Sequence, residues 1–285
     1  MVFRTIIEIK RFTDKCKRDN INAFAAQSAF FLIISLIPFV MVFCSLLQYT
    51  VVSEGMLLKI VREIMPEYIS PVVVSIIDEF YNKSIGIVSL TALLAIWSAA
   101  KGVQYMADGL NVINGIQETR NWIVLRFWAV VYMIGFLLAL LAALLFLVFG
   151  NGIQKILVGY FPFLAHATRL MFQLRSVIML AVLSVMFTVL FKTLPNNKEI
   201  RDRKLTFKNQ LPGGIVCGVA WYVFSFGVSV YVDYFNGFSM YGSLTTVVLV
   251  MLWLYFCMYI MMLCGELNVL FGERIQKRIG ARKYL

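Results

Sequence analysis

Charge is scarce in this sequence. Charged residues make up 14% of the 285 positions, whereas hydrophobic residues make up 61% and the mean hydropathy is +0.82. Typical soluble domains carry about 25% charged residues. So few polar side chains cannot cover a soluble core of this size, and the composition also excludes a disordered chain. It predicts a polytopic membrane protein that forms a single domain over residues 1–285.

Histidine is almost absent. His166 is the single histidine, which excludes a histidine-rich metal site and leaves a Ser–His pair no other base. The zinc-protease, zinc-ribbon, P-loop and dinucleotide-binding motifs are all missing. Asp108 and Asp233 are expected near opposite membrane faces, too far apart to act as an aspartyl pair. We therefore predict no enzyme, no cofactor and no metal site, with unfamiliar Lys or Glu chemistry left open.

External cysteines are missing as well. The five cysteines lie in the amino-terminal tail or inside apolar runs, so no external disulfide is expected. A cleavable signal peptide is not expected either. The first apolar run follows a charged tail at residues 1–20 and is long enough to remain in the membrane.

Six long apolar runs are present. A helix needs about 20 mostly apolar residues to cross a bilayer core. Continuous rather than alternating hydrophobicity favours helices over a barrel, because a lipid-exposed backbone must satisfy its own hydrogen bonds. The predicted fold class is an all-α polytopic membrane helix bundle of six transmembrane helices. The expected spans are Ala25–Tyr49, Ile85–Val112, Phe127–Phe149, Ser176–Leu194, Leu211–Phe235 and Gly242–Leu263.

Lys and Arg are unevenly distributed among the connections. They gather in the first tail, in the second and fourth connections and in the carboxyl-terminal tail at 272–285, and they are sparse elsewhere. The positive-inside rule then places both termini in the cytoplasm, as in a multi-pass protein of the cytoplasmic (inner) membrane. These bases account for the net charge of +11 and favour membrane lipids with anionic head groups as partners. Nucleic acid is not expected, since no basic and aromatic module is visible.

Amphipathic segments are expected outside the spans. The tail at 1–20 favours an interfacial helix, with an ordinary charged leader as the alternative. The first external connection has two amphipathic stretches, Leu57–Met65 and Val72–Phe80, which predict a helical hairpin over the outer mouth of the bundle. A shorter external element is expected at Ile153–Tyr160. These external amphipathic elements either shield the ends of the transmembrane helices or form a lid or lateral entrance for an amphiphile.

The second span carries four polar residues at steps of three, four and three, namely Lys101, Gln104, Asp108 and Asn111. This spacing places them along one side of a helix. A charge at a helix centre in a membrane costs about 2.5–3.5 kcal/mol, so the stripe is expected to face other helices or a wet cavity. Lys101 and Asp108 can neutralise each other when a water or a neighbouring group bridges them.

Three further polar residues extend this set: Gln27 in the first span, and Glu266 and Asn268 at the end of the sixth. One interpretation is a polar cavity that serves as a substrate path between the first, second and sixth spans. The other is that these groups join helices by hydrogen bonds, as polar side chains often do in lipid. Pro38 is expected to break the hydrogen-bond ladder of the first span, and the glycines of the fifth span predict close packing or a hinge.

Several short motifs follow one another along the chain. They are NAFAAQSAFFLIISLIPFVMV (Asn22–Val42), GLNVIN (Gly109–Asn114) with Arg120 and Arg126 after it, YGSL (Tyr241–Leu244), LWLY (Leu252–Tyr255) and GELN (Gly265–Asn268). In this order they resemble the YihY/BrkB family over nearly the whole chain. The resemblance implies a cytoplasmic-membrane protein of about six spans with a poorly defined activity. Some members carry a ribonuclease label, and others are linked to virulence or to envelope lipid export.

The residues argue against a nuclease, because the cytoplasmic acids Glu118, Glu199, Asp202 and Glu273 are scattered among bases without a metal-ligand pattern. We instead predict a transporter or flippase-like exporter of a lipid or amphiphilic anion. In this prediction Lys101 attracts an anionic head group, Asp108 resets or releases it, and Glu266 acts as a cytoplasmic gate or proton site. A non-transporting membrane scaffold or envelope-integrity protein is the alternative, and a membrane-bound ribonuclease stands third. A homo-oligomer is left open.

Overall fold

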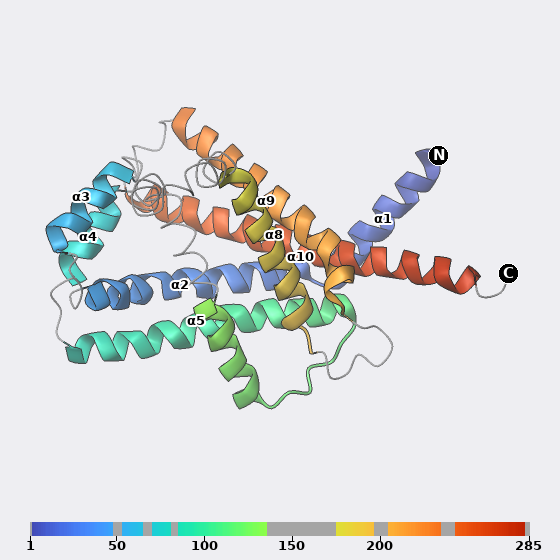
Figure 1. Ribbon diagram of the computed structural model, residues 1–285, viewed down its shortest axis with the longest axis horizontal. Coiled ribbons are helices and arrows are strands. Elements are labelled where there is room, and N and C mark those ends of the chain that lie inside the picture. The colour runs from blue at the N-terminus through green and yellow to red at the C-terminus, as the bar shows by residue number, and fades with distance from the viewer. Residues whose placement is uncertain are drawn as a thin grey trace, which may run out of the picture.

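The computed structural model describes residues 2–47, 53–64, 70–80, 85–135, 175–196, 205–234 and 243–282, and every regular element in these ranges is an α-helix (Figure 1). The all-α class is therefore confirmed, while the six-span topology stays a prediction. The part of the third span after Gly135 and the element expected at Ile153–Tyr160 lie outside the described residues. The helices are α1 (Val2–Arg18), α2 (Ile21–Leu47), α3 (Glu54–Ile64), α4 (Ser70–Phe80), α5 (Ile85–Asn114), the unlabelled helix Trp122–Gly135, α8 (Arg175–Thr193), α9 (Phe207–Tyr234) and α10 (Ser243–Arg282).

The first span begins earlier than predicted. Asn20 has a left-handed backbone with φ of 50°, which ends α1 and lets α2 begin at Ile21 rather than Ala25. Helix α2 continues through Pro38 to Leu47, as expected for a span that includes this proline. A proline removes one backbone donor and bends a helix, but the hydrogen bonds on either side are sufficient to continue it.

The last helix is longer than its apolar run. The span was expected to end at Leu263 with a tail at 272–285, yet α10 continues without interruption to Arg282. The segment after Leu263 is polar but contains no proline, and a helix ends where its hydrogen bonding is interrupted rather than where hydrophobicity falls. Loss of hydropathy therefore marks the end of the apolar run and not the end of the helix, and the membrane boundary stays a prediction.

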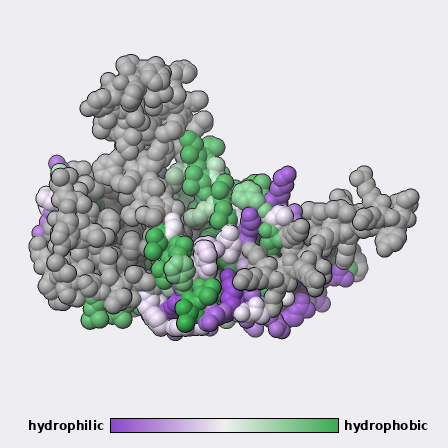
Figure 2. Space-filling model, turned by 60° about the horizontal axis from the view of Figure 1, so that its bottom comes forward, coloured by the Kyte–Doolittle hydropathy of each residue, from purple (hydrophilic) through white to green (hydrophobic). Residues whose placement is uncertain are grey.

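Apolar side chains cover the outside of the bundle. Two segments are long and apolar enough to cross a membrane, Phe207–Val232 in α9 and Val247–Leu270 in α10, with mean hydropathies of 1.9 and 2.5. Only 17% and 28% of their most apolar stretches are buried, so neither is the core helix of a soluble protein. In Figure 2 hydrophobic side chains face outward over the middle of the molecule, and hydrophilic ones gather mostly toward the end that carries the termini. Such an exterior is typical of helices that contact lipid.

The helices pack in two pairs joined by α10. Helix α2 lies against α5, α8 lies against α9, and α10 contacts α2, α5 and α9 (Figure 1). Close approach of α8 and α9 depends on glycine. A side chain at Gly214 would clash with Thr188 and with the backbone of Ser184, and one at Gly218 would meet the Ser184 hydroxyl at 2.7 Å. The close packing predicted from these glycines is therefore present.

The two ends of the bundle differ. Helix α1 and the carboxyl-terminal part of α10 lie at one end, whereas α3 and α4 lie at the other, where α4 packs on α2 (Figure 1). The two amphipathic helices predicted for the first connection are thus present. Helix α1 runs obliquely away from the bundle (Figure 1). Its Phe12 and Cys16 pack against the core, while Ile6, Ile7 and Ile9 are exposed. Its placement on a membrane surface stays a prediction.

Candidate functional site

The polar stripe of α5 faces neighbouring polypeptide on both flanks. Lys101, Gln104 and Asp108 are half-buried and Asn111 is buried. Lys101 approaches α2, Gln104 bonds to the helix Trp122–Gly135, and Asn111 bonds to the connection that follows α5. The stripe therefore lies between elements rather than along a single partner.

Lys101 is held by an aromatic ring and not by an acid. Its Nζ lies 5.0 Å from the centre of the Phe31 ring, which in turn stacks on Tyr105 at 5.4 Å. Such a cation–π contact stabilises a charge by about 0.5–2 kcal/mol, depending on how far it is desolvated. No ion pair joins Lys101 to Asp108 in the described residues, so direct neutralisation of one by the other does not occur there.

Arg126 is a second cation at this stripe, and sequence reasoning treated it only as a topology signal. Its Nη2 donates to the backbone oxygen of Trp97 at 2.6 Å, and its Nη1 lies 3.4 Å from Oε1 of Gln104. The guanidinium lies 4.1 Å from the centre of the Trp97 ring. Arg126 is only 9% exposed, and its Nε has no hydrogen-bond partner in the part of the chain that the structure describes. The sequence signal that could have identified Arg126 as a residue of the candidate site is its position directly before a predicted span.

Asp108 lies farther along the stripe, toward the end that carries both termini. It is half-buried and within electrostatic range of Glu118 and Arg120, whose opposite charges act on it in opposite directions. In the described part of the chain its carboxylate accepts no hydrogen bond that would fix it to one helix. Among the stripe residues it is the charged group least committed to a structural partner.

Asn111 belongs to a network that closes the ends of α5 and α8. Its Nδ2 donates to Glu118 at 2.7 Å, and its Oδ1 accepts the backbone N–H of Asn196 at 2.8 Å. Arg120 binds both carboxylate oxygens of Glu118, at 2.6 and 2.8 Å, and donates to the backbone oxygen of Leu194 at 3.0 Å. Sequence reasoning missed this network, because its members come from a connection and two helix ends that are far apart in the chain.

Glu266 pairs with the first helix. Its side chain is fully buried, and its Oε2 lies 2.5 Å from Nζ of Lys15. Lys15 also pairs with Asp19 at 2.7 Å and donates to the backbone oxygen of Ile113 at 3.0 Å, at the carboxyl end of α5. The other oxygen of Glu266 has no partner in the described residues. This cluster joins α1, α5 and α10 at one point.

Asn268 and Gln27 occupy very different positions. Asn268 is buried and joins α10 to the start of α9: its Oδ1 accepts the N–H of Gly213 at 2.8 Å, and its Nδ2 donates to Oε1 of Gln210 at 2.8 Å. Because these bonds tie α10 to the first two turns of α9, Asn268 has a structural role here. Gln27 is exposed on α2, so the described structure does not bring it together with the stripe.

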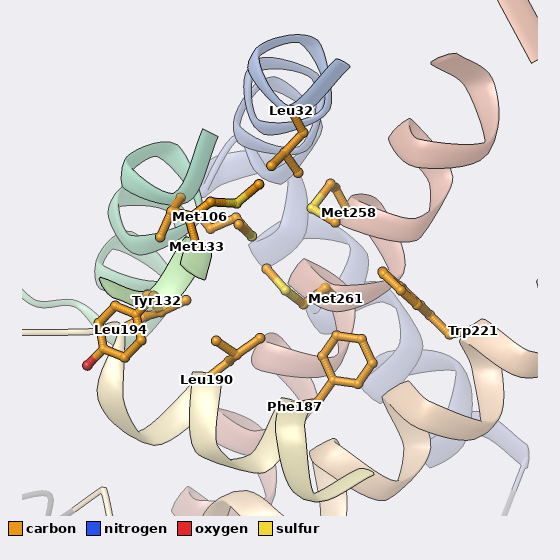
Figure 3. Close-up of a pocket in the computed structure, with 11 residues that line it drawn as sticks. Leu32, Met106, Tyr132, Met133, Phe187, Leu190, Leu194, Trp221, Met258 and Met261 are labelled. Atoms are coloured by element: carbon orange, nitrogen blue, oxygen red, sulfur yellow. The ribbon is translucent and has the colours of Figure 1, made fainter. Parts of the chain in front are cut away.

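The cavity at the centre of the bundle is apolar (Figure 3). It has a volume of about 20 Å³, and none of the seven candidate residues lines it. The indole of Trp221 donates to the backbone oxygen of Cys257 and the hydroxyl of Tyr132 donates to that of Thr193, so the polar atoms of its lining aromatics have partners elsewhere. A water needs two to four polar partners, and an apolar cavity of this kind stays dry.

Comparison with known proteins places this helical chain in a family. The family described as virulence factor BrkB matches residues 12–284. The chain belongs to this family. The expected YihY/BrkB identity is thereby confirmed, and the family together with the apolar helices indicates a membrane location.

Two proteins are similar to this BrkB-family chain over most of the length of both partners in each comparison. The putative ribonuclease-like protein YfkH of Bacillus subtilis (strain 168) is 27% identical over 252 residues, which are 88% of this chain and 90% of the relative. A UPF0761 membrane protein of Alteromonas mediterranea is 22% identical over 282 residues, which are 94% of this chain and 88% of the relative. No solved structure matches. One name describes a membrane protein and the other a putative ribonuclease-like protein, and neither defines an activity for this chain.

Proposed function

We propose that this BrkB-family chain is a multi-pass protein of the cytoplasmic membrane that moves a lipid or another amphiphilic anion across the bilayer. The observation that supports this best is Lys101, a half-buried cation that has no carboxylate partner in the described residues. It lies on a helix of a bundle whose exterior is apolar. A charge placed in this way favours a ligand with an anionic head and an apolar body.

Lys101 lacks a counter-charge among the residues that the structure describes. A cation at the centre of a membrane helix costs about 2.5–3.5 kcal/mol. The contact with Phe31 returns about 0.5–2 kcal/mol, which is less than that cost. An anionic head group would supply the remaining stabilisation, and its acyl chains would match the exposed apolar helices. A small hydrophilic anion would gain the charge interaction with Lys101 but would lack acyl chains to match the apolar helices.

The proposed route follows the α5 stripe and avoids the dry central cavity. A head group would meet Lys101 first and move past Asp108, whose negative charge favours release toward the end that carries both termini. Glu266 lies at that end, where it would act as a gate or proton site. The expectation that both termini are cytoplasmic makes this end the cytoplasmic one.

Reconstitution in liposomes tests the proposal. We would follow a fluorescent anionic lipid, a fluorescent neutral lipid and a small anion in vesicles that contain the wild-type chain, Lys101→Met or Lys17→Met. Lys17 is an exposed lysine of α1, so it controls for loss of one positive charge. We expect transfer of the anionic lipid by the wild type and by Lys17→Met, and a clear loss in Lys101→Met. If all three preparations behave like empty vesicles under every imposed gradient, transport by this chain alone is wrong.

A scaffold is the second candidate, and the dry central cavity with its surrounding helix-end networks favours it. A scaffold needs the α5 stripe only for packing. The double variant Lys101→Met with Asp108→Leu would then keep the cellular phenotype and change only stability, because apolar groups of similar size replace polar packing residues well. Loss of the phenotype in a double variant that folds normally would refute the scaffold.

A ribonuclease is the third candidate and is supported by the printed name of YfkH. The test is an RNA-cleavage assay on purified protein supplemented with divalent metal ions. Cleavage that follows the protein through successive purification steps would support this activity. Absence of cleavage by protein of verified fold would exclude it under those conditions.

A further inference from the structure

Arg126 and Lys101 flank the same turns of α5. Arg126 contacts Trp97 and Gln104, and Lys101 lies between these two residues on the same side of the helix. Both cations rest on aromatic rings, Trp97 and Phe31. Neither has a carboxylate within ion-pair distance among the described residues. These turns of α5 therefore carry two positive charges for which the described residues provide no counter-charge.

The guanidinium of Arg126 still has donors to offer. Within the described residues two of its five N–H groups are used, one in a short bond to the Trp97 backbone and one in a long 3.4 Å bond to Gln104. Its Nε is buried and finds no acceptor among those residues. A buried donor that lacks an acceptor is unfavourable, and the long bond to Gln104 is weak enough for a stronger acceptor to replace it.

We infer that Arg126, Lys101 and Gln104 form a binding site for a phosphate group, and that this phosphate is carried on an amphiphile. This inference rests on the proposed function and names the chemistry of its head group. A guanidinium binds two phosphate oxygens through its parallel N–H groups, and an ammonium adds a point charge. Gln104, half-buried between them, contributes an amide donor.

The surroundings favour a phosphate with acyl chains over free phosphate. The helix that carries Arg126 exposes Trp122, Ile123 and Phe127, which are 55%, 66% and 63% exposed. Tryptophan beside aliphatic residues is typical of the boundary between head groups and acyl chains. A lipid would thus place its phosphate beside Arg126 and its chains against this helix.

Binding to the purified full-length chain in a neutral detergent tests the site without transport. The probes are short-chain phosphatidic acid, the diacylglycerol with the same chains, and inorganic phosphate. The variants are Arg126→Gln, Arg126→Lys and Lys101→Met, with Lys17→Met as the charge control. Because Arg126 is buried and its replacement can affect folding, Lys101→Met and Gln104→Leu provide independent evidence.

We expect phosphatidic acid to bind the wild type and Lys17→Met equally, and to bind Lys101→Met and Arg126→Gln about tenfold or more weakly, with Arg126→Lys between them. Inorganic phosphate should bind much more weakly than phosphatidic acid. If inorganic phosphate and phosphatidic acid bind equally well and both lose affinity in the same variants, the phosphate site stands. The inference that an amphiphile carries this phosphate would then be wrong. Equal binding of diacylglycerol and phosphatidic acid, or wild-type affinity in every folded variant, would overturn the site.

The site and the proposed function fail separately. A chain that binds phosphatidic acid through Lys101 and Arg126 but moves no lipid in liposomes keeps the site and refutes transport. A chain that moves lipid while Arg126 and Lys101 variants bind and move it normally keeps transport, but refutes both the site and the role proposed for Lys101 in transport.

Discussion

Lys15 on the first helix and Glu266 on the last form an ion pair with a distance of 2.5 Å between Nζ and Oε2. The carboxylate is fully buried, and the ammonium also caps the end of α5 through the backbone oxygen of Ile113. The pair therefore determines how α1 meets the bundle. Removal of one partner from a buried pair leaves the other charge uncompensated, which is costly.

Lys15→Met is expected to destabilise the folded chain by about 3–5 kcal/mol, because it leaves the carboxylates of Glu266 and Asp19 without the cation they share. Glu266→Gln should cost less, since a neutral amide tolerates burial better than a carboxylate. Denaturant unfolding in mixed micelles measures both, with the exposed Lys17→Met as the control. A loss below about 1 kcal/mol for Lys15→Met would show that the pair behaves like a surface salt bridge.

Cys16 provides a probe of α1 docking. Burial, and then the negative charge of Glu266, raise the pKa of its thiol to about 11, and the residue is 7% exposed. In a background with the other four cysteines replaced, we expect slow labelling of Cys16 by a water-soluble maleimide at neutral pH. Lys15→Met should accelerate labelling strongly as α1 detaches. Fast labelling of Cys16 in the protein that keeps Lys15 would contradict the packing of α1 on the core.

Two glycines of α9 give a matched test of helix packing. Gly214→Ala should destabilise the chain by about 1–3 kcal/mol, because the new methyl group meets Thr188 and the backbone of Ser184. Gly227→Ala meets nothing within 4 Å in the described residues, and alanine favours helix, so it should be neutral or stabilising by up to about 1 kcal/mol. Equal effects of the two substitutions, measured by thermal unfolding, would argue against the close contact of α8 and α9.

Glu118 should make stability depend on acidic pH. Burial alone would raise the pKa of Glu118, but the hydrogen bonds and charge of Arg120 outweigh it and hold the pKa below its ordinary value of 4.5. The folded state thus binds this proton less readily than the unfolded state, and the resulting stabilisation is present above pH 4.5 and is lost as the pH falls through the lowered pKa. Thermal unfolding between about pH 6 and 3 should show a smaller decline in Glu118→Gln than in the wild type.

Arg120→Met is the companion control for that measurement. Without its partner, the pKa of Glu118 should rise toward its ordinary value or above it, so the loss of stability on acidification should be smaller than in the wild type or absent. Identical pH profiles in the wild type and both variants would mean that Glu118 and Arg120 are not paired in the folded chain.

Apolar periodicity predicted the helices well, because a run of about 20 apolar residues has few alternatives to a helix in lipid. It did not indicate where the helices begin and end, since α2 begins at Ile21 rather than Ala25 and α10 continues beyond Leu263. The partners of polar residues were harder to predict. Lys15 and Glu266 are 251 positions apart, and Asn111 and Asn196 are 85 apart, so only the packed helices bring them together.

Arg126 illustrates the remaining difficulty. A base at the edge of a span serves topology, and nothing in its immediate sequence indicates that it folds back onto Trp97 and Gln104. The sequence did identify Lys101 and the stripe of α5, because their spacing is helical. It did not indicate that the central cavity is apolar, since cavity lining depends on which faces of five or more helices meet.

Electron cryo-microscopy of the chain in nanodiscs that contain phosphatidic acid tests the central claim most directly. The measured quantity is the position of ordered head-group density relative to Lys101 and Arg126. We predict phosphate density within hydrogen-bond distance of both side chains, acyl-chain density along the helix Trp122–Gly135, and no ordered water in the central cavity. Acyl chains in direct contact with the Lys101 ammonium, or head groups only at the bundle periphery away from α5, would contradict the account.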